Sequence, residues 1–140
     1  YIGINDVLNN TPSTSTATYK SYLNLTVEAC VTHNIKVVLV SATTYNEKPD
    51  GSNLYDTQLN EYQQAAEEVA LEFSATFVPA RDHFLNYLKN NNFSVQESGN
   101  VIFPYQTGLL NSDAVHHNQA GKQLLSDLVA DGLQRSLVPN

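Results

Sequence analysis

The sequence has few cations, one cysteine and no long apolar run, and each shortage excludes a class of protein. Seven Lys and Arg residues stand against fourteen Asp and Glu residues, which gives a net charge of −7. Because phosphate binding needs clustered cations, this balance argues against a surface for nucleic acid or an anionic membrane. A single cysteine excludes an internal disulfide framework and an all-cysteine metal cage. No apolar run is long enough to predict a membrane span.

Methionine is also absent, and the first residue is Tyr1. Tyr is too bulky to follow an initiator Met that is readily trimmed. We therefore expect the chain to be a product of processing or a piece of a longer polypeptide. The composition is rich in Asn, Ser and Thr and poor in cations. Compositional drift alone would explain this bias; the alternative, which we adopt as the expectation, is an extracellular, cell-surface or virion protein.

Along the chain, segments whose apolar residues follow the pattern of a strand alternate with segments whose apolar residues follow the period of a helix. The expected strands are residues 1–4, 36–41 and 75–79, and the expected helices are residues 18–33, 57–73, 81–90 and 118–137. Ser15 or Thr16 is expected to cap the first helix, and Asp56 the second. This order predicts an α/β sandwich with a parallel sheet. No linker divides the sequence, so we expect residues 1–140 to form a single domain.

Asp113 and His116 stand three residues apart, just before the last predicted helix. At this spacing a carboxylate can accept a hydrogen bond from one imidazole nitrogen and leave the other to take a proton from a nucleophile. Asn118 is placed to cap the next helix, and Gly121 to let that helix pack close to the sheet. A polar loop with a helix cap is the alternative. Asp113, His116 and His117 are also metal-ligand types, but adjacent histidines rarely converge on one ion, so we expect no metal.

A second polar segment, Gly3-Ile4-Asn5-Asp6, ends the first predicted strand. Ligand sites of parallel sheets form at this carboxyl edge. The side-chain amide of Asn5 would donate an N–H there to an oxyanion, as the tetrahedral intermediate of acyl transfer requires. A simple strand-to-loop turn is the alternative, because Gly, Asn and Asp are all common in turns.

In this order, at the two ends of an α/β unit, the two segments resemble sequence blocks of the SGNH hydrolases, also called the GDSL esterase/lipase superfamily. The matching blocks are Gly3-Ile-Asn5-Asp6 and Asp113-Ala-Val-His116-His-Asn118-Gln-Ala-Gly121. The resemblance covers essentially the whole chain, since the predicted elements between the blocks also follow the family's order. It implies that Asn5 is an oxyanion donor, that Asp113 orients His116, and that His116 is the general base. His117 stands where the family often has Pro and is expected to be a neighbour of the base.

The family's nucleophilic serine block and its second oxyanion donor, a glycine, come before its third strand, and neither block is found here. The resemblance therefore implies a flavodoxin-like three-layer α/β sandwich with a parallel sheet. It implies that this chain is the C-terminal portion of that domain, with only the later strands present. Ser41 ends a predicted strand and is the alternative nucleophile within the sequence. In a flavodoxin-like sheet the third strand pairs with the first, and an open apolar edge is a liability. We expect a partner segment that supplies the serine, either upstream in the same polypeptide or on another chain.

The resemblance implies a carboxylic ester hydrolase that works through an acyl-enzyme and needs no cofactor. The polar composition and the lack of a long apolar lid favour an O-acetylated carbohydrate over a long-chain lipid as the ester substrate. Tyr45 and Tyr105 lie in the loops beside the expected site and suit the faces of sugars, although simple loop packing is their alternative role. A non-catalytic carbohydrate-binding or structural module is the alternative function, and a metal-dependent hydrolase at Asp113, His116 and His117 is a third.

Overall fold

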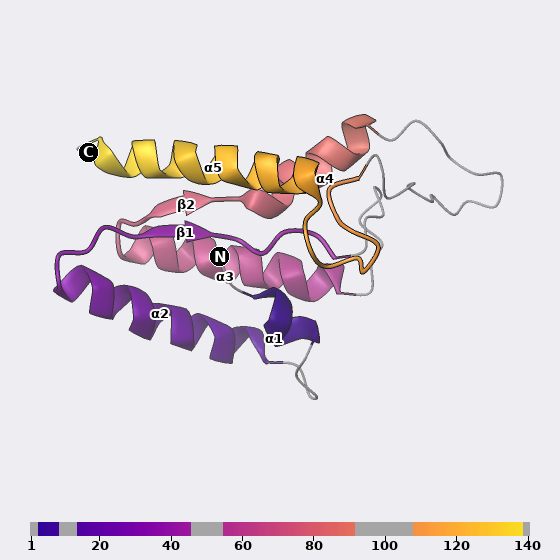
Figure 1. Ribbon diagram of the computed structural model, residues 1–140. Coiled ribbons are helices and arrows are strands. Elements are labelled where there is room, and N and C mark those ends of the chain that lie inside the picture. The colour runs from indigo at the N-terminus through magenta and orange to yellow at the C-terminus, as the bar shows by residue number, and fades with distance from the viewer. Residues whose placement is uncertain (1–2, 9–13, 46–54, 92–107, 139–140) are drawn as a thin grey trace.

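The computed structural model describes residues 3–8, 14–45, 55–91 and 108–138. In chain order their elements are α1 (Ile4–Leu8), α2 (Thr16–Thr32), β1 (Val38–Val40), α3 (Asp56–Glu72), β2 (Thr76–Val78), α4 (Ala80–Asn91) and α5 (Gln119–Leu137). Figure 1 shows that α2 and α3 lie on one side of the two strands and α5 lies on the other. This is the predicted α/β sandwich, and its strands are shorter than the sequence pattern suggested.

The strands β1 and β2 run parallel, with Leu39 opposite Phe77 at the centre of the pairing. Parallel neighbours need a crossover connection, which α3 supplies. Both strands therefore end at the same edge of the sheet, where the N–H of Ser41 donates to the carbonyl of Val78 at 3.1 Å. Among the described residues, no strand lies along the other side of β1.

Local sequence explains two of the three predicted helix caps. The Ser15 hydroxyl oxygen accepts a hydrogen bond from a backbone N–H in the first turn of α2, at 3.1 Å. The Asn118 side chain accepts from the N–H of Gly121 at 3.0 Å and caps α5 in the same way. The prediction for α3 is wrong: Tyr55 holds the cap position, and Asp56 is the first helical residue. The Asp56 carboxylate is engaged in a buried ion pair, which takes it away from the capping role.

The prediction of a strand over residues 1–4 is wrong for residues 3 and 4, the two that the structure describes. Gly3 has a φ of +122°, a conformation that leaves the extended path of a strand and that glycine adopts readily. The chain turns there, and the helix α1 begins at Ile4. Residues 1–2 lie outside the described part of the chain.

Three apolar clusters hold the layers together, and one of them packs α5 on the strands through Val40, Val78 and Val129. The main cluster lies between α2, α3 and the strands and includes Leu23, Val27, Leu59, Tyr62 and Val69. A second cluster joins α4 and α5 to the loop before α5 and includes Phe84, Leu88, Leu109, Leu125 and Leu128. Because Leu109 is fully buried in the second cluster, it anchors the start of that loop against the two helices.

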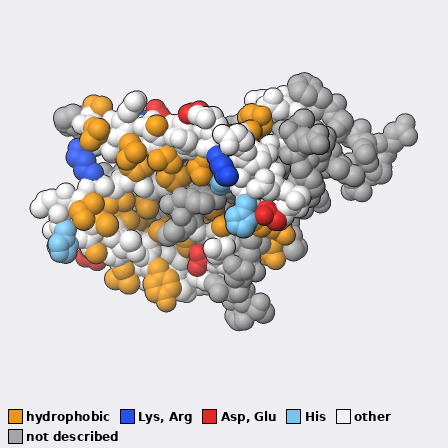
Figure 2. All heavy atoms as spheres, in the orientation of Figure 1, with side chains coloured by type: hydrophobic (Ala, Val, Ile, Leu, Met, Phe, Trp, Pro, Cys, Tyr) orange, Lys and Arg blue, Asp and Glu red, His pale blue; other side chains and the backbone are white. Residues whose placement is uncertain are grey.

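Apolar side chains also reach the surface on the side where β1 forms the edge. Figure 2 shows them gathered between α5 and α2. Ile35, just before β1, is 56% exposed, and Val31, at the end of α2, is 42% exposed. A free strand edge with apolar neighbours is a template for further strand pairing. None of the helices in the described ranges combines the length and apolar character that crossing a bilayer requires.

Candidate active site

The structure brings Asp113 and His116 together on the loop before α5, the orange segment at one end of the molecule in Figure 1. Oδ1 of Asp113 accepts hydrogen bonds from the N–H groups of Val115 at 2.9 Å and His116 at 2.8 Å. Ala114 closes this turn with a left-handed φ of 61°. The other carboxylate oxygen, Oδ2, lies 2.8 Å from Nδ1 of the His116 ring. An ionised carboxylate can only accept, so Nδ1 carries the proton of this bond.

The turn keeps the carboxylate charged. Hydrogen bonds from the backbone N–H groups of His116 and Val115, followed by the bond from the His116 ring, lower the pKa of Asp113 to about 2. With Nδ1 held by Asp113, Nε2 is the ring nitrogen left to accept a proton. The His116 side chain is 80% exposed and the Asp113 side chain 50%. The pair is therefore accessible to an incoming group.

Backbone hydrogen bonds fix the shape of the loop that bears this pair. The N–H of Asn111 donates to the carbonyl of His116 at 2.7 Å, and the N–H of Asn118 donates to the carbonyl of Leu109 at 2.9 Å. The side-chain amide of Asn118 donates to two further loop carbonyls, at 2.6 and 3.2 Å. A Cβ on Gly121 would lie 2.1 Å from the Leu109 carbonyl oxygen, so only glycine fits there. Gly121 thus lets α5 pack closely, but against this loop rather than the sheet.

His117 turns away from the pair and toward the protein interior. Its Nε2 shares a hydrogen bond of 2.9 Å with Oγ1 of Thr43, and its ring lies 5.2 Å from the ring of Phe84. Burial lowers the pKa of His117, and the charge of His116 lowers it further. Within the described ranges, no three His, Cys, Asp or Glu side chains are arranged to hold a metal ion. The metal-site alternative at Asp113, His116 and His117 therefore has no geometric support.

Ser41 does not have the surroundings of a nucleophile. The residue is completely buried. Its hydroxyl donates to Oε1 of Gln63 at 3.0 Å and accepts from the N–H of Arg81 at 3.1 Å. A hydroxyl enclosed and bonded in this way is not open to an ester carbonyl. The alternative that the nucleophile is Ser41 is therefore wrong.

Asn5 lies on the exposed surface of α1, not at the end of a strand as predicted. The backbone of Gly3, two residues earlier, approaches the segment after β1 closely: a Cβ on Gly3 would lie 3.5 Å from Cβ of Ala42. Thr43, the next residue, bonds to His117. The start of α1 and the loop that bears His116 therefore both approach residues 42–43, at the carboxyl edge of the sheet. Figure 1 shows both at the same end of the strands.

The two predicted substrate-binding tyrosines have different outcomes. Tyr45 lies after β1, is half-buried, and packs edge-on against Tyr55 with ring centroids 5.1 Å apart. This contact fits the loop-packing alternative. Tyr105 lies outside the described residues, and its role stays a prediction.

Sequence reasoning missed a buried polar network behind the site. Arg81 is only 1% exposed and forms a buried ion pair with Asp56. Its guanidinium also donates to Oδ1 of Asn60 at 2.7 Å and to the carbonyl of Thr43 at 3.3 Å. A signal was present in the sequence, because Arg81 shares the inward face of α4 with the buried Phe84, three residues later. The network links α3 and α4 to the segment after β1.

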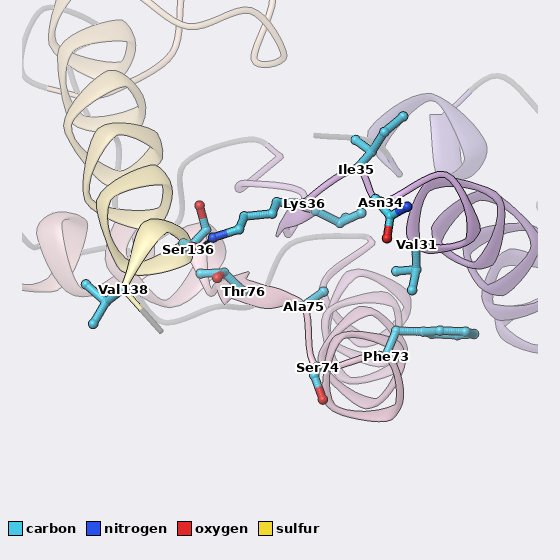
Figure 3. A pocket seen from close by; sticks show the side chains of 11 residues that line it. Val31, Asn34, Ile35, Lys36, Phe73, Ser74, Ala75, Thr76, Ser136 and Val138 are labelled. Atoms are coloured by element: carbon cyan, nitrogen blue, oxygen red, sulfur yellow. Dashed lines mark hydrogen bonds between the residues drawn. The ribbon is translucent and has the colours of Figure 1, made fainter. Parts of the chain in front are cut away.

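A separate groove of about 410 Å³ lies at the opposite ends of the strands (Figure 3). It is formed by the ends of α2, α3 and α5 and by the residues just before β1 and β2. The Lys36 ammonium group crosses it and donates to the carbonyl of Ser136 at 3.0 Å. The groove is therefore distinct from the Asp113–His116 loop.

The layered fold, the parallel strands and the Asp-His pair before the last helix define a class: this is the α/β fold of the SGNH, or GDSL, hydrolases. The acetyl xylan esterase AlAXEase matches with a TM-score of 0.74 and 26% identity, over 99% of this chain and 65% of that one. Axe2, an acetylxylan esterase from Geobacillus stearothermophilus, matches with a TM-score of 0.73 and 21% identity, over 94% and 56%. A GDSL-like lipase from Parabacteroides merdae matches with a TM-score of 0.69 and 22% identity, over 96% and 58%.

The chain spans less than two thirds of the length of each of these three structures. Neither a family model nor a curated protein matches the sequence.

Proposed function

We propose that this chain is the C-terminal part of an SGNH-type carboxylic ester hydrolase that removes acetyl groups from a carbohydrate. The observation that supports this most is the 2.8 Å hydrogen bond between Asp113 and His116, on an exposed loop at the carboxyl edge of the parallel sheet. Ligand sites of such sheets form at this edge. Acetyl xylan esterases are among the solved structures with the same fold, which supports an acetylated glycan as the substrate.

In the proposed reaction a serine hydroxyl attacks the ester carbonyl, and Nε2 of His116 takes the hydroxyl proton. Asp113 orients the ring and stabilises the imidazolium. The side-chain amide of Asn5 donates to the oxyanion of the tetrahedral intermediate. The ester C–O bond then breaks, and the leaving alkoxide takes the proton from His116. Water, deprotonated by His116, then attacks the acyl-serine. The bond between the acyl group and the serine oxygen breaks, the serine oxygen takes the proton back from His116, and the acid is released.

The proposed serine comes from outside this sequence, either from an upstream segment of the same polypeptide or from another chain. Two observations support this part of the proposal. Ser41 is buried and bonded, and the side of β1 away from β2 has no strand beside it in the described ranges. A parallel strand added on that side would end at the same edge of the sheet as the His116 loop. The polar, cation-poor composition supports an extracellular, cell-surface or virion location for the assembled enzyme.

Replacing His116 tests the proposed function. In the complete enzyme, His116→Ala is expected to lower kcat for acetate release from acetylated xylooligosaccharides by at least about a thousandfold, because no other group would take the serine proton. His83→Ala, at an exposed histidine on α4, is the matched control and should retain full activity. Full activity in His116→Ala would contradict the mechanism. Glycan binding without any acetate release by the unaltered enzyme would favour the non-catalytic module instead.

A further inference from the structure

The loop that bears Asp113 and His116 meets the sheet edge through a specific polar contact. Thr43, in the segment after β1, is 1% exposed. Its Oγ1 lies 2.9 Å from Nε2 of His117, the residue directly after His116. The ring of Phe84 also lies beside the His117 ring, at a centroid distance of 5.2 Å. Here a histidine side chain links the loop before α5 to the end of β1.

The Thr43 side of this contact is itself held in place. The guanidinium of Arg81 donates to the carbonyl of Thr43 at 3.3 Å. Arg81 in turn pairs with Asp56 and donates to Asn60 at 2.7 Å, both on α3. The Thr43 backbone is therefore fixed by a buried network that reaches α3 and α4. A group that bonds to the Thr43 hydroxyl is therefore held in a fixed position relative to the rigid part of the fold.

We propose that His117 is a positioning residue, whose hydrogen bond to Thr43 holds the Asp113–His116 loop at the sheet edge and sets the direction of the His116 ring. This inference rests on the proposed function, because a fixed ring direction matters only if Nε2 must meet a nucleophile. General-base catalysis requires the two reacting atoms within hydrogen-bond reach, and small misplacements of the base are costly. The loop's own hydrogen bonds set its shape, while the Thr43 bond sets its place on the sheet.

The electrostatics of His117 suit this role. Burial lowers the pKa of its imidazole, and so do the charges of His116 and Lys122. His117 is therefore biased to stay neutral while His116 takes up a proton. A second cation directly beside the base would oppose that protonation.

The test measures hydrogen exchange of two loop amides in the full chain. These are the N–H groups of Asn111 and Asn118, which are bonded to loop carbonyls at 2.7 and 2.9 Å. Thr43→Val removes the hydroxyl at nearly constant volume and is expected to speed their exchange about five- to tenfold, the value of one lost hydrogen bond. Thr43→Ser keeps the hydroxyl and should restore slow exchange. The amide of Ala75, at the far end of the strands, should be unaffected in both variants.

Thr44, the residue after Thr43, offers a matched control for the exchange measurement. Thr44 is also 1% exposed, and within the described part of the chain its hydroxyl has no hydrogen-bond partner. Thr44→Val should therefore leave the exchange of Asn111 and Asn118 unchanged. Should Thr43→Val not fold, His117→Phe removes the ring nitrogens, keeps an aromatic ring beside Phe84, and should give the same loosening.

Unchanged exchange in both Thr43→Val and His117→Phe would overturn the proposal. So would equal loosening in Thr44→Val, because that would show a general packing effect. These measurements need no substrate, so they can fail while the esterase proposal stands. Conversely, full activity of His116→Ala would refute the esterase proposal and leave the exchange result intact. In the complete enzyme, Thr43→Val should lower kcat about tenfold at constant KM, because His117 is placed to orient the base and not to bind substrate.

Discussion

A single carboxylate, Asp113, accepts three hydrogen bonds from its own loop. Two come from backbone N–H groups and one from the ring of His116, and the backbone bonds contribute most to its lowered pKa. The loop therefore fixes the carboxylate before any substrate is present. This local pre-organisation depends on the left-handed turn at Ala114, which lets the following N–H groups point back at the side chain.

The pH dependence of this turn follows from the direction of the shift. The pKa of Asp113 falls from 3.8 to about 2 in the folded chain, so the folded state favours the ionised form. The turn is therefore fully stabilised above pH 3.8, and that stabilisation is lost as the pH falls toward 2. A carboxyl-detected NMR titration should place the Asp113 midpoint at about 2.

The same titration in His116→Ala separates the causes. The two backbone N–H groups remain in that variant, so the Asp113 midpoint should stay below 3.8. A return to 3.8 would show that the imidazole, and not the turn, holds the carboxylate ionised. A midpoint near 3.8 in the unaltered chain would contradict the geometry of the turn itself.

At the scale of elements, α5 packs against the strands at a glycine. A Cβ on Gly132 would lie 2.5 Å from Cγ2 of Val78 and 3.1 Å from Cγ1 of Val38. Gly132→Ala should lower the free energy of unfolding by about 1–3 kcal/mol, because the β-branched valines have little freedom to move aside. Urea unfolding of the full chain measures this loss.

A double-mutant cycle identifies the contact responsible. Val78→Ala removes the closer methyl group, so the loss in Gly132→Ala/Val78→Ala should be smaller than the sum of the two single losses. Ser126→Ala, at an exposed position on α5, should change the free energy of unfolding by less than about 0.5 kcal/mol. Additive losses in the cycle would show that α5 does not approach the sheet at this point.

The sequence pattern predicted the long elements well and the short ones less well. Helices α2, α3 and α5 lie within two residues of their predicted bounds, because a helix of several turns repeats its apolar period several times. The strands hold three residues each, so their ends depend on which neighbours pair with them. The turn at Gly3 was unpredictable for a similar reason: nothing in Gly-Ile-Asn-Asp distinguishes the end of a strand from the start of a short helix.

Across the whole molecule, contacts between distant residues explain what the sequence could not reveal. The Asp113–His116 bond spans three residues, so its spacing alone predicted it. The bond from Thr43 to His117 spans 74 residues and depends on how β1 meets the loop before α5. Ser41 looked accessible at a strand end, yet the packing of α3 and α4 encloses it. Such burial follows from the assembled layers and not from any local pattern.

The buried pair of Arg81 and Asp56 is another of these long-range features, and it yields a prediction about overall stability. Arg81→Met would leave the Asp56 carboxylate buried without its cation, at an expected cost of about 3–5 kcal/mol in the free energy of unfolding. The exposed pair of Lys20 and Glu68, which also joins two elements, is the matched control: Lys20→Met should cost much less than Arg81→Met, because water screens an exposed pair. Arg81→Met/Asp56→Leu should cost less than the sum of its two single changes, since no lone charge remains buried. Urea unfolding compares all of these variants, and equal losses in Arg81→Met and Lys20→Met would show that the buried network does not hold α3, α4 and the site edge together.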